Sequence, residues 1–290
     1  MRASFLFSIV AFAWSLAVAP GVGAGEALLM NVLPLETPIV MAKKFKPLAD
    51  YLTTALGQEV QVKPGKDYAA SVADVGGLKH QLAYTSPTLW AKLARLHPDA
   101  GMEMVALVCL DGKPFTNSCI IVAKDSLVQT LADLKGKSFA FGNEDSTGSH
   151  LYPRWMLKQA GIERDGGLGS FSYTGTHANV LKAVEAGKAD AGGLTEGVAL
   201  TGVEAGTVRI LATSEPVPEF AIVINKSFPA ALKPKLLTAL TALSSSTPEH
   251  VAMLSPINKK MTGFIAAKGD EYAKPAEMIL KLYGEAFFAK

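Results

Sequence analysis

Short apolar runs and helix-period patterns alternate along most of this chain. Residues 27–33 form a continuous apolar run of strand length, and residues 41–56 then carry apolar side chains three and four positions apart, as one face of a helix requires. Pro47 falls inside this helical pattern, so we expect the helix to bend there or to begin later. Further strands are expected at 59–63, 82–84, 105–110, 118–123, 139–142, 171–173, 189–194, 208–213 and 221–224. Because helical patterns separate most of these strands, the sequence predicts an α/β fold with mostly parallel sheets.

The first 24 residues have the pattern of a targeting segment. Arg2 supplies a positive charge, residues 5–19 are apolar, and residues 22–24 are small, as at a cleavage site. The apolar stretch is too short for a comfortable membrane span. We therefore expect a signal peptide over residues 1–24 and a mature chain that begins near Gly25, is not membrane-spanning and functions outside the cytoplasm.

Length and composition exclude some classes of protein. The chain has 290 residues, of which 49% are hydrophobic and 19% charged, so a globular protein with two lobes of ordinary size is expected. The formal net charge is only +2, with acidic and basic residues interspersed. Nucleic acid is not an expected partner, since no polyanion-binding face is indicated.

Residues 138–150 carry the most informative pattern. A short buried strand ends at Gly142, and two strong N-cap residues, Ser146 and Thr147, then precede a helical pattern over 151–160. A helix start presents free N–H groups and the positive end of the helix dipole, for which an oxyanion is the natural ligand. The alternative is a plain helix cap with no ligand.

Three other stretches place polar chemistry at expected strand ends, where α/β folds bind ligands. Residues 84–90 bring hydroxyl groups and Trp90 to one strand end, and residues 174–179 bring His177 to the start of a helix. Residues 188–196 carry acids at both ends of a strand, Asp190 and Glu196.

With these stretches in this order, the sequence resembles the periplasmic phosphate/phosphonate-binding proteins, the PhnD-like group within the type II solute-binding fold. The resemblance runs from Val32 to about Phe264. It is carried by Asp67-Tyr68, the Ser86-Pro87 turn, Ser146-Thr147-Gly148-Ser149, and Gly175-Thr176-His177 leading to Ala189-Asp190-Ala191.

The resemblance implies a two-lobe periplasmic binding protein of type II, with the chain crossing twice between the lobes, near 110–118 and 213–218. On this basis the first part of lobe 1 covers 25–112, lobe 2 covers 113–213, and 214–290 return to lobe 1.

The resemblance also implies a binding site between the lobes. Tyr68 closes on the ligand from lobe 1; Ser146, Thr147 and Ser149 donate to the oxygens of an anion. His177 is a further donor. Glu196 and Glu219 lie near the acidic acceptors of the family, which would accept a proton from the ligand and repel fully ionised sulfate. The complete expected ligand set is Tyr68, Ser86, Trp90, Ser146, Thr147, Ser149, His177, Glu196 and Glu219.

This chain departs from the family pattern at several of these positions. Trp90 stands where a tyrosine is usual, Ala178 follows His177 where the family often has an acid, and Glu219 replaces a shorter aspartate. These departures leave the identity of the anion open. Each residue also has a structural alternative, such as Tyr68 at the rim of a helix and Trp90 in the core.

Cys109 and Cys119 are the only two cysteines. They fall in two successive expected strands, so a cystine across a hairpin is the default in an oxidising compartment. The alternative is a pair of thiols that captures a soft ligand such as arsenite.

The sequence thus predicts a periplasmic solute-binding protein that captures a small phosphorus oxyanion (phosphonate, phosphite or phosphate) for an ABC permease. The alternative is an arsenite-type sensor that signals through a histidine kinase. We expect a monomer with no metal and no cofactor. Enzymatic activity is not expected, because the nucleophile-elbow, zinc-protease and phosphate-loop motifs are missing.

Overall fold

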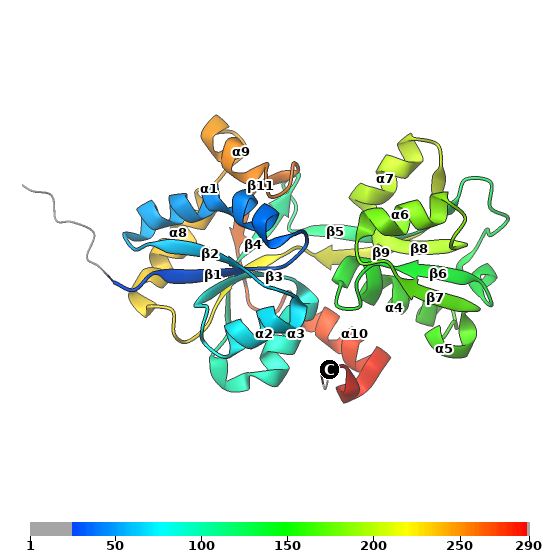
Figure 1. Cartoon of the computed structure of the whole chain (residues 1–290), viewed down its shortest axis with the longest axis horizontal. Helices are drawn as coiled ribbons and strands as arrows, with labels where there is room; N and C mark the ends of the chain where they lie inside the picture. Colours follow the sequence, from blue (N-terminus) through cyan, green and yellow to red (C-terminus); the bar gives the residue numbers. More distant parts are fainter. Residues whose placement is uncertain (1–24, 289–290) are drawn as a thin grey trace, which may run out of the picture.

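The computed structural model describes residues 25–288, so the expected signal peptide lies outside the described residues. Two lobes lie side by side, each built on one β-sheet with helices packed around it (Figure 1). The two-lobe α/β prediction is confirmed. Within residues 25–288, no helix is long and apolar enough to cross a membrane.

The sheet of lobe 1 has six strands in the order β11-β4-β10-β3-β1-β2. Its strands are β1 (Leu28–Val32), β2 (Val60–Pro64), β3 (Leu82–Thr85), β4 (Glu103–Leu110), β10 (Ala221–Ile224) and β11 (Met261–Ala266). Strands β1, β2 and β3 are parallel, whereas β10 and β11 join antiparallel to their neighbours. The helices of this lobe are α1 (Pro38–Leu56), α2 (Tyr68–Gly76), α3 (Pro87–Leu96), α8 (Lys233–Thr241) and α9 (Pro248–Leu254).

The sheet of lobe 2 has five strands in the order β7-β6-β8-β5-β9. They are β5 (Phe115–Ala123), β6 (Ser138–Phe141), β7 (Ser170–Tyr173), β8 (Ala191–Thr195) and β9 (Val208–Pro218). Its helices are the π-helical turn η3 (Thr147–Leu151), α4 (Tyr152–Gln159), α5 (Arg164–Gly167), α6 (His177–Glu185) and α7 (Glu196–Glu204). Here β6, β7 and β8 are parallel and β5 runs antiparallel to both neighbours. Both sheets are therefore more mixed than the sequence pattern indicated. Strands β5 and β10, which enter from the other lobe, run antiparallel to their neighbours, and so does β11 in lobe 1.

Helix α1 continues through an internal proline because one of its faces is apolar and buried. The helix begins at Pro38. Proline is tolerated at this position because an N–H group in the first turn would have no carbonyl partner within the helix. It continues through Pro47 to Leu56 and ends at Gly57, whose φ of 68° is the left-handed cap conformation. The helix starts at Pro38, earlier than expected, and its buried stripe offsets the hydrogen bond lost at Pro47 so that the helix continues. The stripe consists of Met41, Phe45, Leu48, Ala49, Leu52 and Leu56.

The two crossings between lobes form a two-stranded ribbon. Strands β5 and β9 pair antiparallel along their length, from Ala123 opposite Val208 to Phe115 opposite Pro218. The second crossing was expected as a proline-rich connection and is instead the end of a strand. Its prolines are tolerated since β9 is the edge of its sheet, where a missing N–H breaks no ladder bond.

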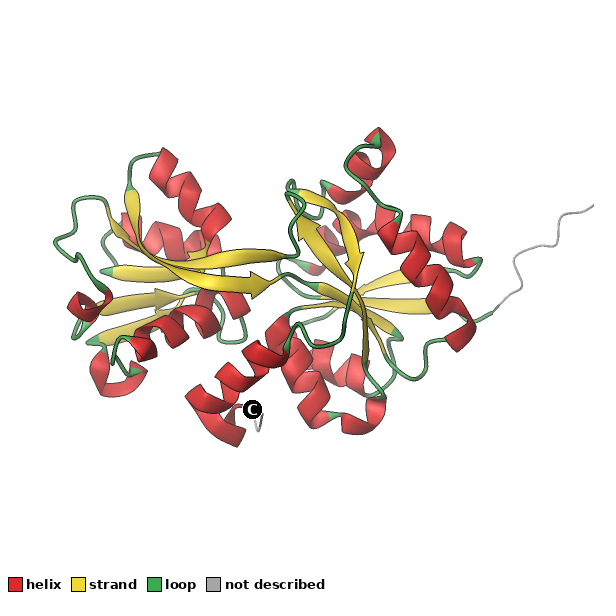
Figure 2. Ribbon diagram, turned by 180° about the vertical axis from the view of Figure 1, so that it is seen from behind, coloured by secondary structure: helices red, strands yellow, loops and turns green. Residues whose placement is uncertain are grey.

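The C-terminal part of the chain lies against both lobes. After the edge strand β11, which the sequence analysis did not predict, come α10 (Ala273–Tyr283) and the 3₁₀ turn η5 (Gly284–Phe287). In Figures 1 and 2 this segment occupies the space beside the ribbon, between the two lobes. The remaining 3₁₀ turns are η1 (Pro98–Ala100), η2 (Leu131–Leu134) and η4 (Ala230–Leu232).

Candidate functional site

The strand-turn-helix predicted around residue 146 is present in lobe 2. Strand β6 is followed by a turn in which the Ser146 hydroxyl accepts a hydrogen bond of 3.1 Å from the Ser149 N–H, as an N-cap should. The first turn is wider than an α-helix, because the Leu151 N–H bonds to the Ser146 carbonyl five residues back. Gly142 is required at the end of the strand, since a Cβ there would lie 2.1 Å from the Ser149 Oγ.

Ser149 lies fully buried at the start of this turn. Its Oγ has no hydrogen-bond partner among the described residues. A buried hydroxyl without a partner costs free energy, so such groups in native structures call for an explanation, and a binding site is one. In lobe 1 the hydroxyls of Thr85, at the end of β3, and Ser71, in α2, are also buried without partners within residues 25–288.

His177 lies beside the same turn, as the first residue of α6. The Thr195 N–H donates to its Nδ1 at 3.1 Å, so the ring proton of the neutral form resides on Nε2. Nε2 is 3.4 Å from the Ser146 Oγ. Burial lowers the pKa of His177 to about 4, and the ring is therefore a neutral hydrogen-bond donor at pH 7. Thr195 was not predicted as a site residue, yet it determines which ring nitrogen donates.

The helix starts of the two lobes meet at Thr88 and Thr147. The Thr147 Oγ1 accepts from the Thr88 N–H at 3.2 Å and shares a 2.8 Å hydrogen bond with the Thr88 hydroxyl. One turn further along α3, the Lys92 Nζ lies 2.7 Å from an Asp145 carboxylate oxygen, and both side chains are largely buried. The sequence analysis missed this pair; a lysine on the buried face of α3 was the only indication.

Tyr68, Ser86 and Trp90 are the expected ligand residues on the helices of lobe 1, and their environments differ from one another. Tyr68 begins α2 and is partly buried; burial and the charge of Asp145 raise its pKa to about 12, so the hydroxyl stays protonated. Ser86 is buried as the N-cap of α3 and accepts from the Leu89 N–H at 3.4 Å. Trp90 packs edge-on against Tyr272 with ring centroids 6.3 Å apart, which fits the core alternative better than a ligand contact.

The two acidic residues of the expected ligand set, Glu219 and Glu196, differ in burial. Glu219 follows β9, is only 6% exposed, and burial raises its pKa to about 7. It lines a cavity of about 90 Å³ together with the stacked rings of Tyr84 and Phe220. Glu196 is the first residue of α7, directly after Thr195, and is partly buried. Its charge contributes to the raised pKa of the Cys119 thiol.

The expected cysteine pair is not formed, which corrects the sequence prediction. Cys109 lies in β4 of lobe 1 and Cys119 in β5 of lobe 2, and both are buried free thiols. The Cys119 Sγ lies 3.8 Å from the Thr213 hydroxyl, while Cys109 lies near Glu219. The two strands belong to different sheets instead of one hairpin, so neither a cystine nor a shared thiol site is assembled.

The structure thus brings part of the expected ligand set together. Ser146, Thr147, Ser149 and His177 surround one helix start in lobe 2, and Ser86 caps the facing helix in lobe 1. Among the described residues, no group of three or more histidine, cysteine or acidic side chains is placed to hold a metal ion.

Comparisons with known proteins agree with this geometry. The family model of the phosphonate ABC transporter periplasmic substrate-binding protein matches residues 30–272. A probable ABC transporter phosphite-binding protein, PhnD1 of Prochlorococcus marinus, is 26% identical over 209 residues, or 68% of this chain. A phosphate-import protein, PhnD of Mycolicibacterium smegmatis, is 25% identical over 179 residues, or 59% of this chain. The matches span 65% and 55% of these two relatives, less than two thirds of either.

Solved structures share the fold. Prochlorococcus marinus PhnD1 in complex with methylphosphonate superposes with a TM-score of 0.74 at 22% identity, covering 89% of this chain and 98% of that one. A binding-protein component of a phosphonate ABC transporter from Pseudomonas aeruginosa gives 0.72 at 18% identity, covering 88% and 86%. The matched family model covers most of the chain, and the chain therefore belongs to the periplasmic substrate-binding proteins of phosphonate ABC transporters.

Proposed function

We propose that this protein captures a small phosphorus oxyanion between its lobes and delivers it to an ABC permease. Phosphite, phosphate and methylphosphonate are the candidate ligands, since these are the ligands in the names of its relatives. The family implies a periplasmic location, and the pattern of residues 1–24 supports export with a cleaved signal peptide. We further propose that the protein acts as a monomer.

The observation that carries the proposal is the fully buried, unpartnered hydroxyl of Ser149 at a helix start. The neighbouring donors are the neutral His177 ring and the hydroxyls of Ser146 and Thr147. An oxyanion bound here would accept from this hydroxyl, from His177 Nε2 and from free N–H groups of the turn. Hydrogen bonds to a charged acceptor contribute about 1.5–3 kcal/mol each, more than those between neutral groups.

Carboxylates near an anion site favour ligands that carry a proton. Burial raises the pKa of Glu219 to about 7, and we propose that in the ligand complex this carboxyl accepts a hydrogen bond from a protonated phosphorus oxyanion. Sulfate has no proton to offer at this pH, and a charged carboxylate would repel it. We therefore propose that the acids Glu196 and Glu219 select against sulfate.

The sensor alternative receives no support from the site. It relied on a pair of thiols that captures a soft ligand, and Cys109 and Cys119 lie in separate sheets.

The test is calorimetric titration of residues 25–290 with phosphite, phosphate and methylphosphonate, and with sulfate and arsenite as comparison ligands. The proposal predicts binding of at least one phosphorus oxyanion and at least ten-fold weaker binding of sulfate. Ser172→Ala, which removes an exposed hydroxyl on β7, serves as the matched control for serine substitutions in the site. Absence of binding for all three phosphorus oxyanions, or preference for arsenite, would refute the proposal.

A further inference from the structure

The C-terminal segment connects the two lobes without being part of the chain crossings. It leaves lobe 1 at Tyr272, which is 1% exposed and donates its hydroxyl to the Glu219 carbonyl at 2.5 Å. Helix α10 then packs against α3 in lobe 1 and against η3 and α4 in lobe 2. Any movement that separates the lobes must break one of these two sets of contacts.

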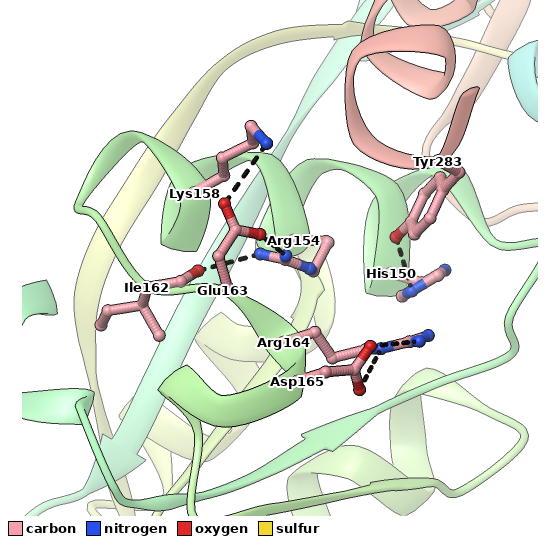
Figure 3. Close-up of polar contacts among 8 residues, drawn as sticks. All are labelled: His150, Arg154, Lys158, Ile162, Glu163, Arg164, Asp165 and Tyr283. Carbon is pink, nitrogen blue, oxygen red and sulfur yellow. Dashed lines mark hydrogen bonds and ion pairs between the residues drawn. The ribbon is translucent and has the colours of Figure 1, made fainter.

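Within residues 25–288, a side-chain hydrogen bond joins the end of α10 to the turn that carries the candidate anion site. The Tyr283 hydroxyl lies 3.0 Å from Nε2 of His150, a residue of η3, and Figure 3 shows the phenol pointing at the ring. The His150 Nδ1 is 2.5 Å from the Glu144 carbonyl oxygen, so Nδ1 carries the proton and donates. Nε2 is therefore an acceptor with one lone pair, and the hydroxyls of Tyr283 and Tyr173 share it as donors at 3.0 and 3.1 Å.

Apolar side chains extend this contact over the seam between the lobes. One buried cluster combines residues of α3, η3, α4, β9 and the C-terminal segment; it contains Ala91, Leu151, Tyr152, Val217, Met278, Ile279, Phe287 and Phe288. The Phe287 ring lies 4.8 Å from the Nζ of Lys92, whose ion pair with Asp145 joins the lobes. Glu285 also pairs with Arg95 of α3 at 2.9 Å.

We propose that residues 273–288 act as a strap that fastens the lobes in the closed arrangement, and that Tyr283 and Phe287 set ligand affinity without contacting the ligand. Tyr272 anchors the strap in lobe 1, so opening releases its lobe 2 contacts, those with His150 and with the apolar residues of η3 and α4. Apparent affinity scales with the fraction of molecules in the binding-competent state, so a weaker strap lowers affinity. The effect on affinity rests on the proposed function, whereas the effect on lobe closure does not.

The chain offers a matched control for the key hydrogen bond. The hydroxyl of Tyr173 lies 3.1 Å from the same His150 Nε2, but Tyr173 is in β7, in the same lobe as His150. Tyr283→Phe and Tyr173→Phe thus remove the same group beside the same acceptor. Only the first removes a contact between the lobes. Phe287→Ala is a second strap variant that removes apolar contact and leaves the hydrogen bond in place.

The experiment measures the distance between the lobes without any ligand. Spin labels are attached at two exposed positions, Thr54→Cys in α1 and Lys188→Cys after α6. Pulsed electron paramagnetic resonance then reports the distance between them. The two natural thiols are buried in the folded protein, so the labels react at the introduced cysteines. We expect Tyr283→Phe and Phe287→Ala to add a population with a longer distance, and Tyr173→Phe to keep the wild-type distribution. With phosphite as the titrant, Tyr283→Phe should bind about two- to ten-fold more weakly than wild type, the range that loss of one hydrogen bond allows. Phe287→Ala should also bind more weakly than wild type, because it removes apolar contact from the strap.

The strap is refuted if both strap variants keep the wild-type distribution, if Tyr173→Phe opens the lobes equally, or if the wild-type protein is already open without ligand. Circular dichroism of each variant confirms that it is folded. Since the distances are measured without ligand, a protein that bound no phosphorus oxyanion would overturn the proposed function and still leave the strap tested.

Discussion

Ser149→Ala should change stability and ligand binding in opposite directions. The Ser149 hydroxyl is fully buried, has no partner among the described residues, and lies in the narrow space beside Gly142. An unsatisfied buried hydroxyl costs about 1–3 kcal/mol of desolvation. Removing it should leave the free protein as stable as wild type or more stable by up to about that amount. The void left by one oxygen atom offsets part of this gain.

Binding should weaken in the same variant. If the hydroxyl donates to a charged oxyanion, its loss costs about 1.5–3 kcal/mol, which is roughly ten- to a hundred-fold in Kd. The neighbouring Ser146→Ala differs because Ser146 caps the helical turn. That variant should lose about 1 kcal/mol of stability as well as affinity. The contrast separates a hydroxyl that serves the ligand from one that serves the fold.

The assay combines urea unfolding without ligand and calorimetric titration with phosphite or the tightest-binding oxyanion of the panel. Ser172→Ala is the control for a hydroxyl outside the site. The reasoning fails if Ser149→Ala binds as tightly as wild type, or if it unfolds with a free energy more than about 1 kcal/mol below wild type. Either result would mean that the hydroxyl serves packing, and that the turn is a helix cap without a ligand.

Three further predictions concern the buried acid, the thiols and the N-terminus. Because burial raises the pKa of Glu219 to about 7, the folded protein holds a proton that the unfolded chain releases above pH 4.5. The contribution of Glu219 to stability therefore falls as pH rises from about 4.5 to 7. Glu219→Gln should unfold like wild type at pH 4 and be more stable at pH 8, by up to about 3 kcal/mol; equal stability at both pH values in urea unfolding would contradict the assignment. Without reductant, Cys109 and Cys119 should be unreactive toward a thiol reagent in the folded protein and should both react once the protein is unfolded. Reductant should not change the Tm. Fewer than two reactive thiols in the unfolded, unreduced protein would indicate a disulfide. Mass spectrometry of the exported protein should give a chain that begins near Gly25 and carries no lipid, and an intact N-terminus would contradict the expected cleavage.

The sequence predicted the parts of the fold that local pattern determines. Residues 138–160 showed a strand, a glycine, two cap residues and a helical pattern, and the structure has these elements in that order. The structure showed what local pattern cannot encode. Cys109 and Cys119 fall in successive strands but in different sheets, and only the long-range pairing of β5 with β9 and β8 decides this.

The same limit applies to the site. The pattern of Ser146, Thr147 and His177 was visible because helix starts have recognisable residues. The contact between Thr88 and Thr147 was not, since it joins residues 59 apart in sequence across two lobes. The contact of Trp90 with Tyr272 was not visible either, because Tyr272 lies far along the chain; the ring packs against the lobe 1 core, and its contact with the ligand stays a prediction.

A crystal structure of residues 25–290 grown with the tightest-binding phosphorus oxyanion examines the anion site itself. We predict that the phosphorus lies at the helix start in lobe 2, with anion oxygens within about 3 Å of the Ser149 Oγ and the His177 Nε2. The Ser86-Thr88 turn of lobe 1 should close over the opposite side of the anion. An anion bound elsewhere, or a Ser149 hydroxyl still without a partner in the complex, would contradict the proposed site.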